Sequence, residues 1–113
     1  MPVEQPAVPL AVRLAALGSE PRLRILAELS AGPLHVSELA RRVSMSRQLL
    51  YLHLAKLEQA GFVSGVADVA EDGKSLKLFA LNDFELNVDI ARIVGEYPQT
   101  PWRRDAGPGA AEA

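Results

Sequence analysis

The chain contains no cysteine in its 113 residues. Disulfide bonds, thiol redox switches and thiolate metal sites are therefore excluded. No apolar run reaches the roughly 18 residues that a membrane-spanning helix needs. The N-terminal segment carries Glu4 and several prolines, and it lacks the basic cluster that opens a secretory signal peptide. Together these absences favour a cytoplasmic protein that does not contact a membrane.

A net positive charge is also lacking, because 12 Lys and Arg stand against 14 Asp and Glu, a formal charge of −2. The charge is unevenly spread along the chain. Residues 13–60 hold seven basic and four acidic residues, a net charge of +3, whereas residues 61–113 hold five basic and nine acidic residues, a net charge of −4. A local basic face is sufficient for DNA binding, because the phosphates neutralised at the interface determine the affinity.

Catalytic and metal-binding patterns are missing as well. Ser, His and Asp all occur, but no nucleophile elbow, Gly-rich phosphate loop or paired-carboxylate motif is present, so we do not expect an enzyme. The two histidines, His35 and His53, have no ligand partners at a recognisable spacing. We therefore expect no metal and no cofactor. For His53 we expect packing or capping at the end of a helix, or a contact with a phosphate.

The length and a hydrophobic fraction of 49% are those of one folded domain. Residues 1–9 contain three prolines, and residues 98–113 are rich in Pro, Gly and Ala. Both segments lack apolar periodicity, and we expect them to be flexible. Trp102 is an exception, for which docking on the domain and exposure to solvent are equal alternatives. The ordered domain is then expected over residues 10–97.

The first half of this domain shows helical spacing. Residues 10–17 predict a first helix, which stops at Gly18. Ser19 is placed to cap a second helix, with Pro21 in its first turn, where a missing N–H costs little. The inner stripe of the second helix is expected to contain Leu23, Leu26 and Leu29, with Ile25 added.

Residues 37–61 carry the most informative pattern, SELARRVSMSRQLLYLHLAKLEQAG. A short helix, a tight turn at residues 43–45 and a longer helix capped by Ser46 are predicted. The apolar face of the short helix holds Leu39, Ala40 and Val43. The stripe of the longer helix holds Leu50, Leu54 and Leu57. Two short helices joined by a tight turn, with polar side chains opening the second, form the arrangement that places a helix in the DNA major groove.

The longer helix carries the candidate DNA-binding residues. The Arg47 fork suits guanine O6 and N7, the Gln48 amide suits adenine N6 and N7, and the Tyr51 hydroxyl suits a phosphate. Of Leu49 and Leu52, one is suited to touch a thymine methyl group and the other to pack on the wing or a neighbouring helix. The candidate set is Ser46, Arg47, Gln48, Leu49, Tyr51, Leu52 and Lys56. The alternative is an ordinary solvated helix face.

Two strand-like runs follow, Phe62–Ala70 and Ser75–Asn82, with an Asp-Gly hairpin signal between them. Residues 33–36 are too short for a helix and suit an edge strand. Lys74 at the hairpin tip and Lys77 on the return strand are candidates for DNA-backbone contact. Three acidic residues oppose that contact: Asp68, Glu71 and Asp72.

Four motifs occur in order: LGSEPRLRILAEL (17–29), SELARRVSMS (37–46), HLAKLEQAGFV (53–63) and GKSLKLFAL (73–81). Together they resemble the arsenic-repressor (ArsR) family of winged helix-turn-helix regulators. The resemblance implies a mainly α (α+β) fold with about five helices and a two- or three-stranded β-wing. It further implies a bacterial or archaeal transcription regulator, usually a homodimeric repressor whose terminal helices form the dimer contact. Metal sensing is not expected here, since the thiolates are absent and the last helix has no histidine.

The terminal helices are apolar on more than one face, and a two-fold partner would cover them. The dimerisation candidates are Leu10, Leu14, Ile90, Ile93 and Val94. We interpret the protein as a sequence-specific regulator that binds a palindromic operator in double-stranded DNA and acts as a dimeric repressor. Two alternatives stay open. One is a winged-helix protein–protein interaction module, and the other is a repressor with an unidentified small-molecule effector.

Overall fold

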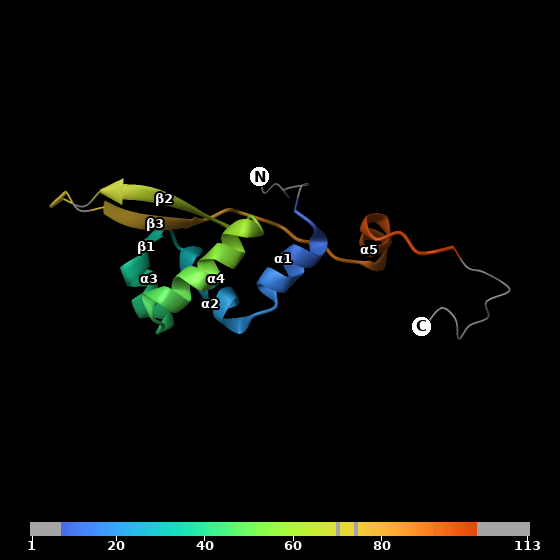
Figure 1. The fold of residues 1–113 in the computed structure, drawn as a ribbon, viewed down its shortest axis with the longest axis horizontal. Helices are drawn as coiled ribbons and strands as arrows, with labels where there is room; N and C mark the ends of the chain where they lie inside the picture. Colours follow the sequence, from blue (N-terminus) through green and yellow to red (C-terminus); the bar gives the residue numbers. More distant parts are fainter. Residues whose placement is uncertain (1–7, 70, 74, 102–113) are drawn as a thin grey trace.

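The computed structural model describes residues 8–69, 71–73 and 75–101, so the expectations for Lys74 and Trp102 lie outside the described residues. Within them, five helices are combined with a three-stranded antiparallel sheet (Figure 1). The elements are α1 (Leu10–Leu17), α2 (Glu20–Leu29), β1 (Leu34–His35), α3 (Val36–Val43), α4 (Arg47–Gln59), β2 (Val63–Val69), β3 (Ser75–Leu81) and α5 (Ile90–Glu96). This is the winged helix-turn-helix architecture that the sequence predicts.

The sheet has the strand order β1-β3-β2. The wing is the β2–β3 hairpin, in which Val63 pairs with Leu81 and Val69 pairs with Ser75. Both strands are shorter than expected, although the Asn82 N–H still donates to the Phe62 carbonyl at 2.9 Å. The expected edge strand is the two-residue β1, which lies along β3. Val36 opens α3 instead of ending that strand.

The helix boundaries follow from local chemistry. The Ser19 side chain accepts a hydrogen bond from the Arg22 N–H, and Pro21 lies in the first turn of α2. Between α3 and α4 the chain turns at Ser44, which adopts the left-handed conformation with φ 55° and ψ 48°. The Met45 N–H then donates to the Ala40 carbonyl at 3.1 Å. The tight turn expected at residues 43–45 is therefore confirmed.

One hydrophobic core joins α2, α3, α4 and the sheet. It contains Ile25, Leu26, Leu29, Leu39, Ala40, Leu50, Leu54, Leu57, Phe62, Val63 and Phe79. The stripes predicted on α3 and α4 are confirmed, with Val43 at the edge of the core. The prediction for Leu23 is wrong, because this side chain is 49% exposed while Ile25 is fully buried. Residues 25, 26 and 29 form the inner stripe, and a residue two positions before Ile25 falls on the other side of a helix.

The wing packs tightly where it leaves the core. Gly65 on β2 pairs with Phe79 on β3. A Cβ at residue 65 would lie 2.8 Å from the Phe79 ring and 2.9 Å from the Lys77 side chain. Glycine at this position therefore lets the Phe79 ring and the Lys77 stem lie across the β2 backbone.

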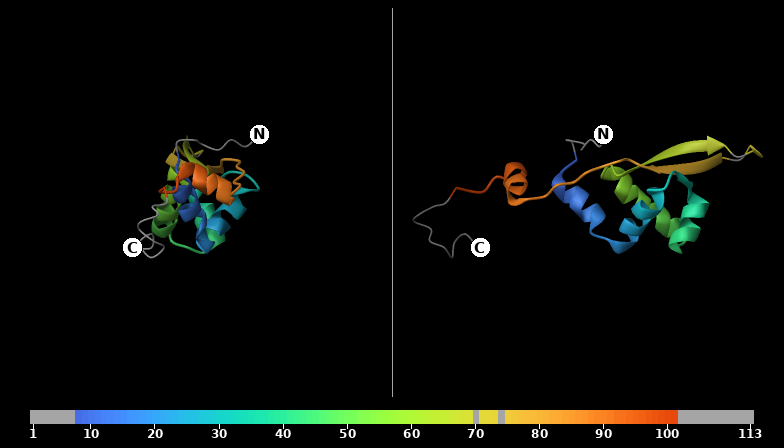
Figure 2. Two further views of the ribbon diagram at one scale, coloured as in Figure 1. Left: turned by 90° about the vertical axis from the view of Figure 1, so that its right-hand side faces the viewer. Right: turned by 180° about the vertical axis from the view of Figure 1, so that it is seen from behind.

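The C-terminal helix α5 packs at the end of the described structure opposite the wing, where it contacts the start of α1. Figures 1 and 2 show the wing tip at one end and α5 at the other, beside the N-terminal end of α1. The α1 helix has no side-chain cap of its own at Pro9. Instead, the Leu10 N–H donates to Glu96 Oε1 at 2.5 Å and the Ala11 N–H donates to the Tyr97 hydroxyl at 3.2 Å. The C-terminal end of α5 thus satisfies the free N–H groups that open α1.

Candidate nucleic-acid interface

The orientation of α4 is determined at its start and along its inner face. Ser46 Oγ accepts a hydrogen bond from the Leu49 N–H at 3.1 Å, which caps the helix as predicted. The inner face is the fully buried leucine stripe described above, which packs against α2, α3 and β2. Because that face is fixed in the core, the other side chains of α4 are exposed, apart from the half-buried His53.

All seven residues predicted for DNA contact on this helix are exposed: Ser46, Arg47, Gln48, Leu49, Tyr51, Leu52 and Lys56. The expectation that one of the two leucines packs on the wing or a neighbouring helix is wrong. Leu49 is 45% exposed and Leu52 is 68% exposed. The outer surface of α4 therefore combines amide, cationic, phenolic and aliphatic groups that stay exposed among the described residues.

The cations of α4 differ from those of the neighbouring helices. Within residues 8–69, 71–73 and 75–101, Arg47 and Lys56 make no hydrogen bond or ion pair. By contrast, Arg24 pairs with Glu20 at 2.8 Å, and both Arg41 and Arg42 pair with Glu38. Arg24, Arg41 and Arg42 are thus paired with carboxylates, whereas the two cations of α4 are left for an external anion.

Glu38, in the first turn of α3, pairs with the two arginines in the last turn of the same helix. Arg42 Nε donates to its Oε2 at 2.9 Å, and Arg41 donates to both of its oxygens. These hydrogen bonds from Arg41 and Arg42 lower the pKa of Glu38 from 4.5 to about 2. Both arginines are therefore engaged with a carboxylate of α3 itself.

A hydrogen bond between side chains of α2 and α4 joins the two helices. Arg22 Nε donates to His53 Nδ1 at 3.2 Å, and Arg22 Nη1 donates to the Ala15 carbonyl at 3.1 Å. Burial and the adjacent Arg22 charge lower the pKa of His53 below its ordinary value of 6.5. The packing role expected for His53 is observed.

Among the described residues of the wing, Lys77 is the cation, and several others are acidic. Lys77 Nζ lies 5.7 Å from the centre of the Phe79 ring, so this lysine is exposed and partly held by a cation–π contact. Asp68 pairs with His35, with Oδ2 and Nε2 3.1 Å apart. The hydrogen bond from His35 lowers the pKa of Asp68 below its ordinary value. This pair ties β2 to the residue that precedes α3, across the width of the sheet.

A buried arginine lies on the other side of the domain. Arg13 of α1 is 1% exposed, and its guanidinium carbon lies 4.5 Å from the centre of the Phe62 ring. The Phe62 ring in turn packs edge to face on the Phe84 ring, with the ring centres 4.5 Å apart. Arg13 Nε has no hydrogen-bond partner among the described residues. The aromatic face offsets part of the cost of burying this cation, and its charge is not available to a ligand at the surface.

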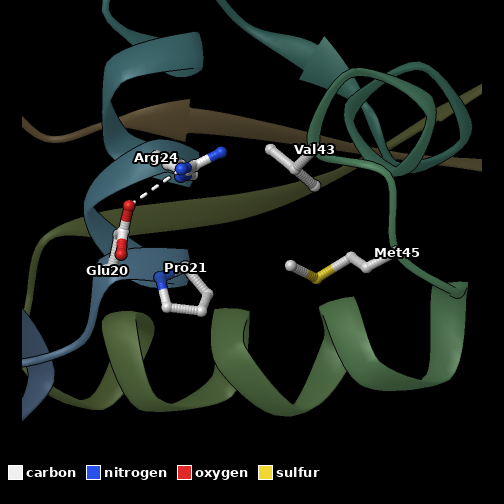
Figure 3. A pocket seen from close by; sticks show the side chains of 5 residues that line it. All are labelled: Glu20, Pro21, Arg24, Val43 and Met45. Carbon is white, nitrogen blue, oxygen red and sulfur yellow. Dashed lines mark hydrogen bonds and ion pairs between the residues drawn. The ribbon is translucent and has the colours of Figure 1, made fainter.

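A shallow pocket lies between the start of α2 and the turn before α4. Figure 3 shows Glu20, Pro21 and Arg24 on one side of it and Val43 and Met45 on the other. Its volume is about 240 Å³. The Arg24–Glu20 ion pair lies at its edge, with both side chains largely exposed. The polar groups nearest to this pocket are thus already paired with each other.

The terminal helices expose the apolar residues that were predicted for dimerisation, with one exception. Ile90 is 72% exposed, Ile93 is 38% exposed, Val94 is 44% exposed and Leu14 is 41% exposed. Leu10 is only 2% exposed, so it is covered within the chain and offers no surface of its own. Val12 and Tyr97 add to the exposed set.

Sequence reasoning did not find three contacts that the fold creates. They are Arg22–His53, His35–Asp68 and Arg13–Phe62, each between residues at least 31 positions apart. A buried arginine could have been suspected only from its place on the apolar side of α1. Over the described parts of the chain, no group of three His, Asp or Glu side chains is arranged to hold a metal ion. In the same parts, none of the helices has the length and apolar character needed to cross a bilayer.

Known proteins share both the sequence pattern and the fold. A family described as a helix-turn-helix domain matches residues 17–66. An HTH-type transcriptional regulator of Methanocaldococcus jannaschii is 32% identical over 74 residues, which are 66% of this chain and 77% of that protein. HlyU from Vibrio cholerae superposes with a TM-score of 0.57 at 31% identity, covering 79% of this chain and 91% of HlyU.

An ArsR family transcriptional regulator of known crystal structure superposes with a TM-score of 0.56 at 27% identity, covering 66% of this chain and 76% of that one. The family resemblance read from the four motifs is thereby confirmed, and transcription regulators of this kind are DNA-binding proteins rather than a class of enzymes. With its capped α4, its three-stranded sheet and these relatives, the chain belongs to the ArsR-like family of winged helix-turn-helix transcriptional regulators.

Proposed function

We propose that this regulator binds a specific palindromic sequence in duplex DNA as a homodimer and represses transcription there. In this proposal, α4 enters the major groove and the wing approaches the flanking backbone. The folded unit spans residues 10–97. The protein acts in the cytoplasm without a metal ion, a cofactor or catalysis.

The observation that carries the proposal is the distribution of unpaired charge. Arg47 and Lys56 are exposed on the helix that follows the tight turn, and within the described chain they have no partner. Arg24 of α2 is paired with Glu20, and Arg41 and Arg42 of α3 are paired with Glu38. Only cations that are not already neutralised gain from replacing the counterions around DNA phosphates. A net charge of −2 is therefore compatible with a DNA-binding face on α4.

The roles proposed on this face follow from its chemistry. Arg47 and Gln48 lie in the first turn, where bidentate contacts to guanine and adenine edges are made. Tyr51 and Lys56 suit phosphate contacts, and Ser46 keeps its hydroxyl proton for donation while its oxygen caps the helix. On the wing, Lys77 suits the backbone. The Asp68 carboxylate is engaged by the His35 ring, with Oδ2 and Nε2 3.1 Å apart.

The dimer is proposed from the terminal helices. No residue of α5 is buried, and its Ile90, Ile93 and Val94 are exposed together with the adjoining Val88 and Tyr97. The helix α1, whose Val12 and Leu14 are exposed, lies at the same end of the described structure as α5, far from the wing tip (Figure 2). A two-fold partner on this surface would leave both α4 helices free and would present them to half-sites about one helical turn apart.

Selection of bound fragments from random duplex DNA with the purified protein tests this proposal. The expected result is a palindromic consensus whose affinity falls steeply with salt concentration. Failure to enrich any sequence, together with salt-independent binding, would overturn it. Because repression rather than activation is proposed, transcription from a promoter that overlaps the consensus should decrease when the protein is added.

One observation favours a second candidate, a winged-helix protein-interaction module. Leu49 and Leu52 are exposed on α4, and large apolar groups at a surface are typical of protein contacts. The two functions differ in their salt dependence, because a protein contact made through leucines does not release counterions from a polyanion. A repressor controlled by a small-molecule effector at the dimer interface would be an addition to the first function, recognised by a ligand-dependent change in DNA affinity.

A further inference from the structure

Leu52 is the most exposed large apolar side chain of α4, at 68%. Helical spacing sets it in the middle of the outer face, because Gln48 precedes it by four residues and Lys56 follows it by four. Leu49 lies three residues before it on the adjoining row. An aliphatic side chain thus stands between an amide that can read a base and an ammonium group that can hold a phosphate.

Duplex DNA offers one apolar group to a helix in the major groove. This group is the C5 methyl of thymine, whereas the remaining base edges present hydrogen-bond donors and acceptors. A leucine pressed against a polar edge would remove water from that edge without supplying a hydrogen bond, which is unfavourable. Contact between Leu52 and a base pair is therefore favourable when the base is thymine and costs free energy at the other bases.

The charges around Leu52 favour DNA over a protein as the partner of this face. Arg47 and Lys56 have no partner inside the described structure, and the single acidic residue of α4 is Glu58, in its last turn. The leucine surface is continuous with the polar residues of the first turn, beginning at the capped Ser46. A polyanion that also carries methyl groups complements both features together.

We propose that Leu52 determines sequence specificity by contacting the 5-methyl group of one thymine in each half-site, with Leu49 closing the side of that contact. This inference rests on the proposed DNA-binding function and adds the base type that the middle of α4 selects. The operator should therefore contain a thymine in each half-site, one or two base pairs from the pair contacted by Gln48.

The test uses the consensus found by selection and replaces each thymine in turn by uracil, which removes only the methyl group. At one position per half-site, uracil should weaken binding about fourfold, as the burial of roughly one methyl group implies. The reverse substitution gives an independent arm. When cytosine replaces that thymine, 5-methylcytosine should bind more tightly than cytosine by a similar factor.

The Leu52→Ala variant should bind thymine and uracil operators equally while keeping its salt dependence and its melting temperature. Val66→Ala, which removes a 56% exposed residue from the wing, is the matched control and should keep the thymine preference. If the wild type binds its consensus with no methyl effect at any position, the inference is overturned and the DNA-binding function stands. The same holds if Leu52→Ala retains the full methyl effect. If no sequence is selected at all, the DNA-binding function itself fails.

Discussion

Arg22 on α2 donates a hydrogen bond from Nε to Nδ1 of His53 on α4, 3.2 Å away. An arginine can only donate, so His53 must accept at Nδ1 and remain neutral. Burial and the Arg22 charge lower its pKa below 6.5 for the same reason. The contact therefore ties the orientation of the candidate recognition helix to the protonation of one histidine.

The first prediction is a loss of stability as the pH falls. Above pH 6.5, His53 is neutral in both the folded and the unfolded state, so the Arg22–His53 contact contributes fully to the free energy of unfolding. Below pH 6.5 the unfolded chain takes up a proton that the folded chain resists, and the contribution is lost as the pH falls through the folded pKa. Chemical denaturation from about pH 8 to about pH 5 should show a falling free energy of unfolding. His53→Gln should flatten that fall, whereas His35→Gln should not remove it.

Glu38 gives a second dependence at lower pH. Its pKa is about 2 in the folded protein because Arg41 and Arg42 donate to it, against an ordinary value of 4.5. A lowered pKa contributes stability above the ordinary value, and that contribution disappears as the pH falls toward the folded value. Between these two pH values, the melting temperature of Glu38→Gln should fall less steeply with decreasing pH than that of the wild type. Glu58→Gln, an exposed change on α4, should behave like the wild type.

Gly65→Ala should destabilise the wing and the core together. The added methyl group would lie 2.8 Å from the buried Phe79 ring, so the ring or the strand has to move. Such overpacking costs about 1–3 kcal/mol, measurable by chemical denaturation. Gly95→Ala is the control, because no described atom lies within 4 Å of the added group. A Gly65→Ala protein as stable as the wild type would show that Phe79 can repack.

Ile90→Asp should convert the proposed dimer to a monomer. Ile90 is 72% exposed at the start of α5, and a charge there would be buried without a partner by a two-fold contact. Light scattering at micromolar concentration measures the mass. Val69→Asp, at a similarly exposed valine on the wing, should remain dimeric. A wild-type protein with the mass of one chain would contradict the dimer directly.

Changing Arg47 and Gln48 together to Ala should abolish specific DNA binding without unfolding the protein. Both are exposed in the first turn of α4, and each lost bidentate contact should cost about 1–3 kcal/mol. Lys56→Ala should instead weaken binding to all sequences alike and lower the salt dependence by roughly one phosphate contact. Binding titrations against the consensus and a scrambled duplex separate these outcomes. An unchanged preference in the double variant would move base readout away from the first turn.

The sequence by itself determined the elements whose causes are local. Ser19 and Ser46 cap the helices that follow them, and the leucine stripe of α4 marks its buried face. The Asp-Gly signal marks the wing. These features depend on residues within a few positions of one another, so spacing alone is sufficient to find them. The family could be recognised for the same reason, because its motifs are local and ordered.

Only the tertiary structure decided which charges are available and which apolar groups are covered. Arg13 and Arg47 are the same residue type, yet one lies against Phe62 in the interior and the other is exposed on α4. Leu10 is covered and Leu52 is not. Burial depends on what the chain brings alongside from distant positions, as do the His35–Asp68 and Arg22–His53 contacts. Periodicity within one helix reports its own faces, but it carries no information about which neighbours will pack against them.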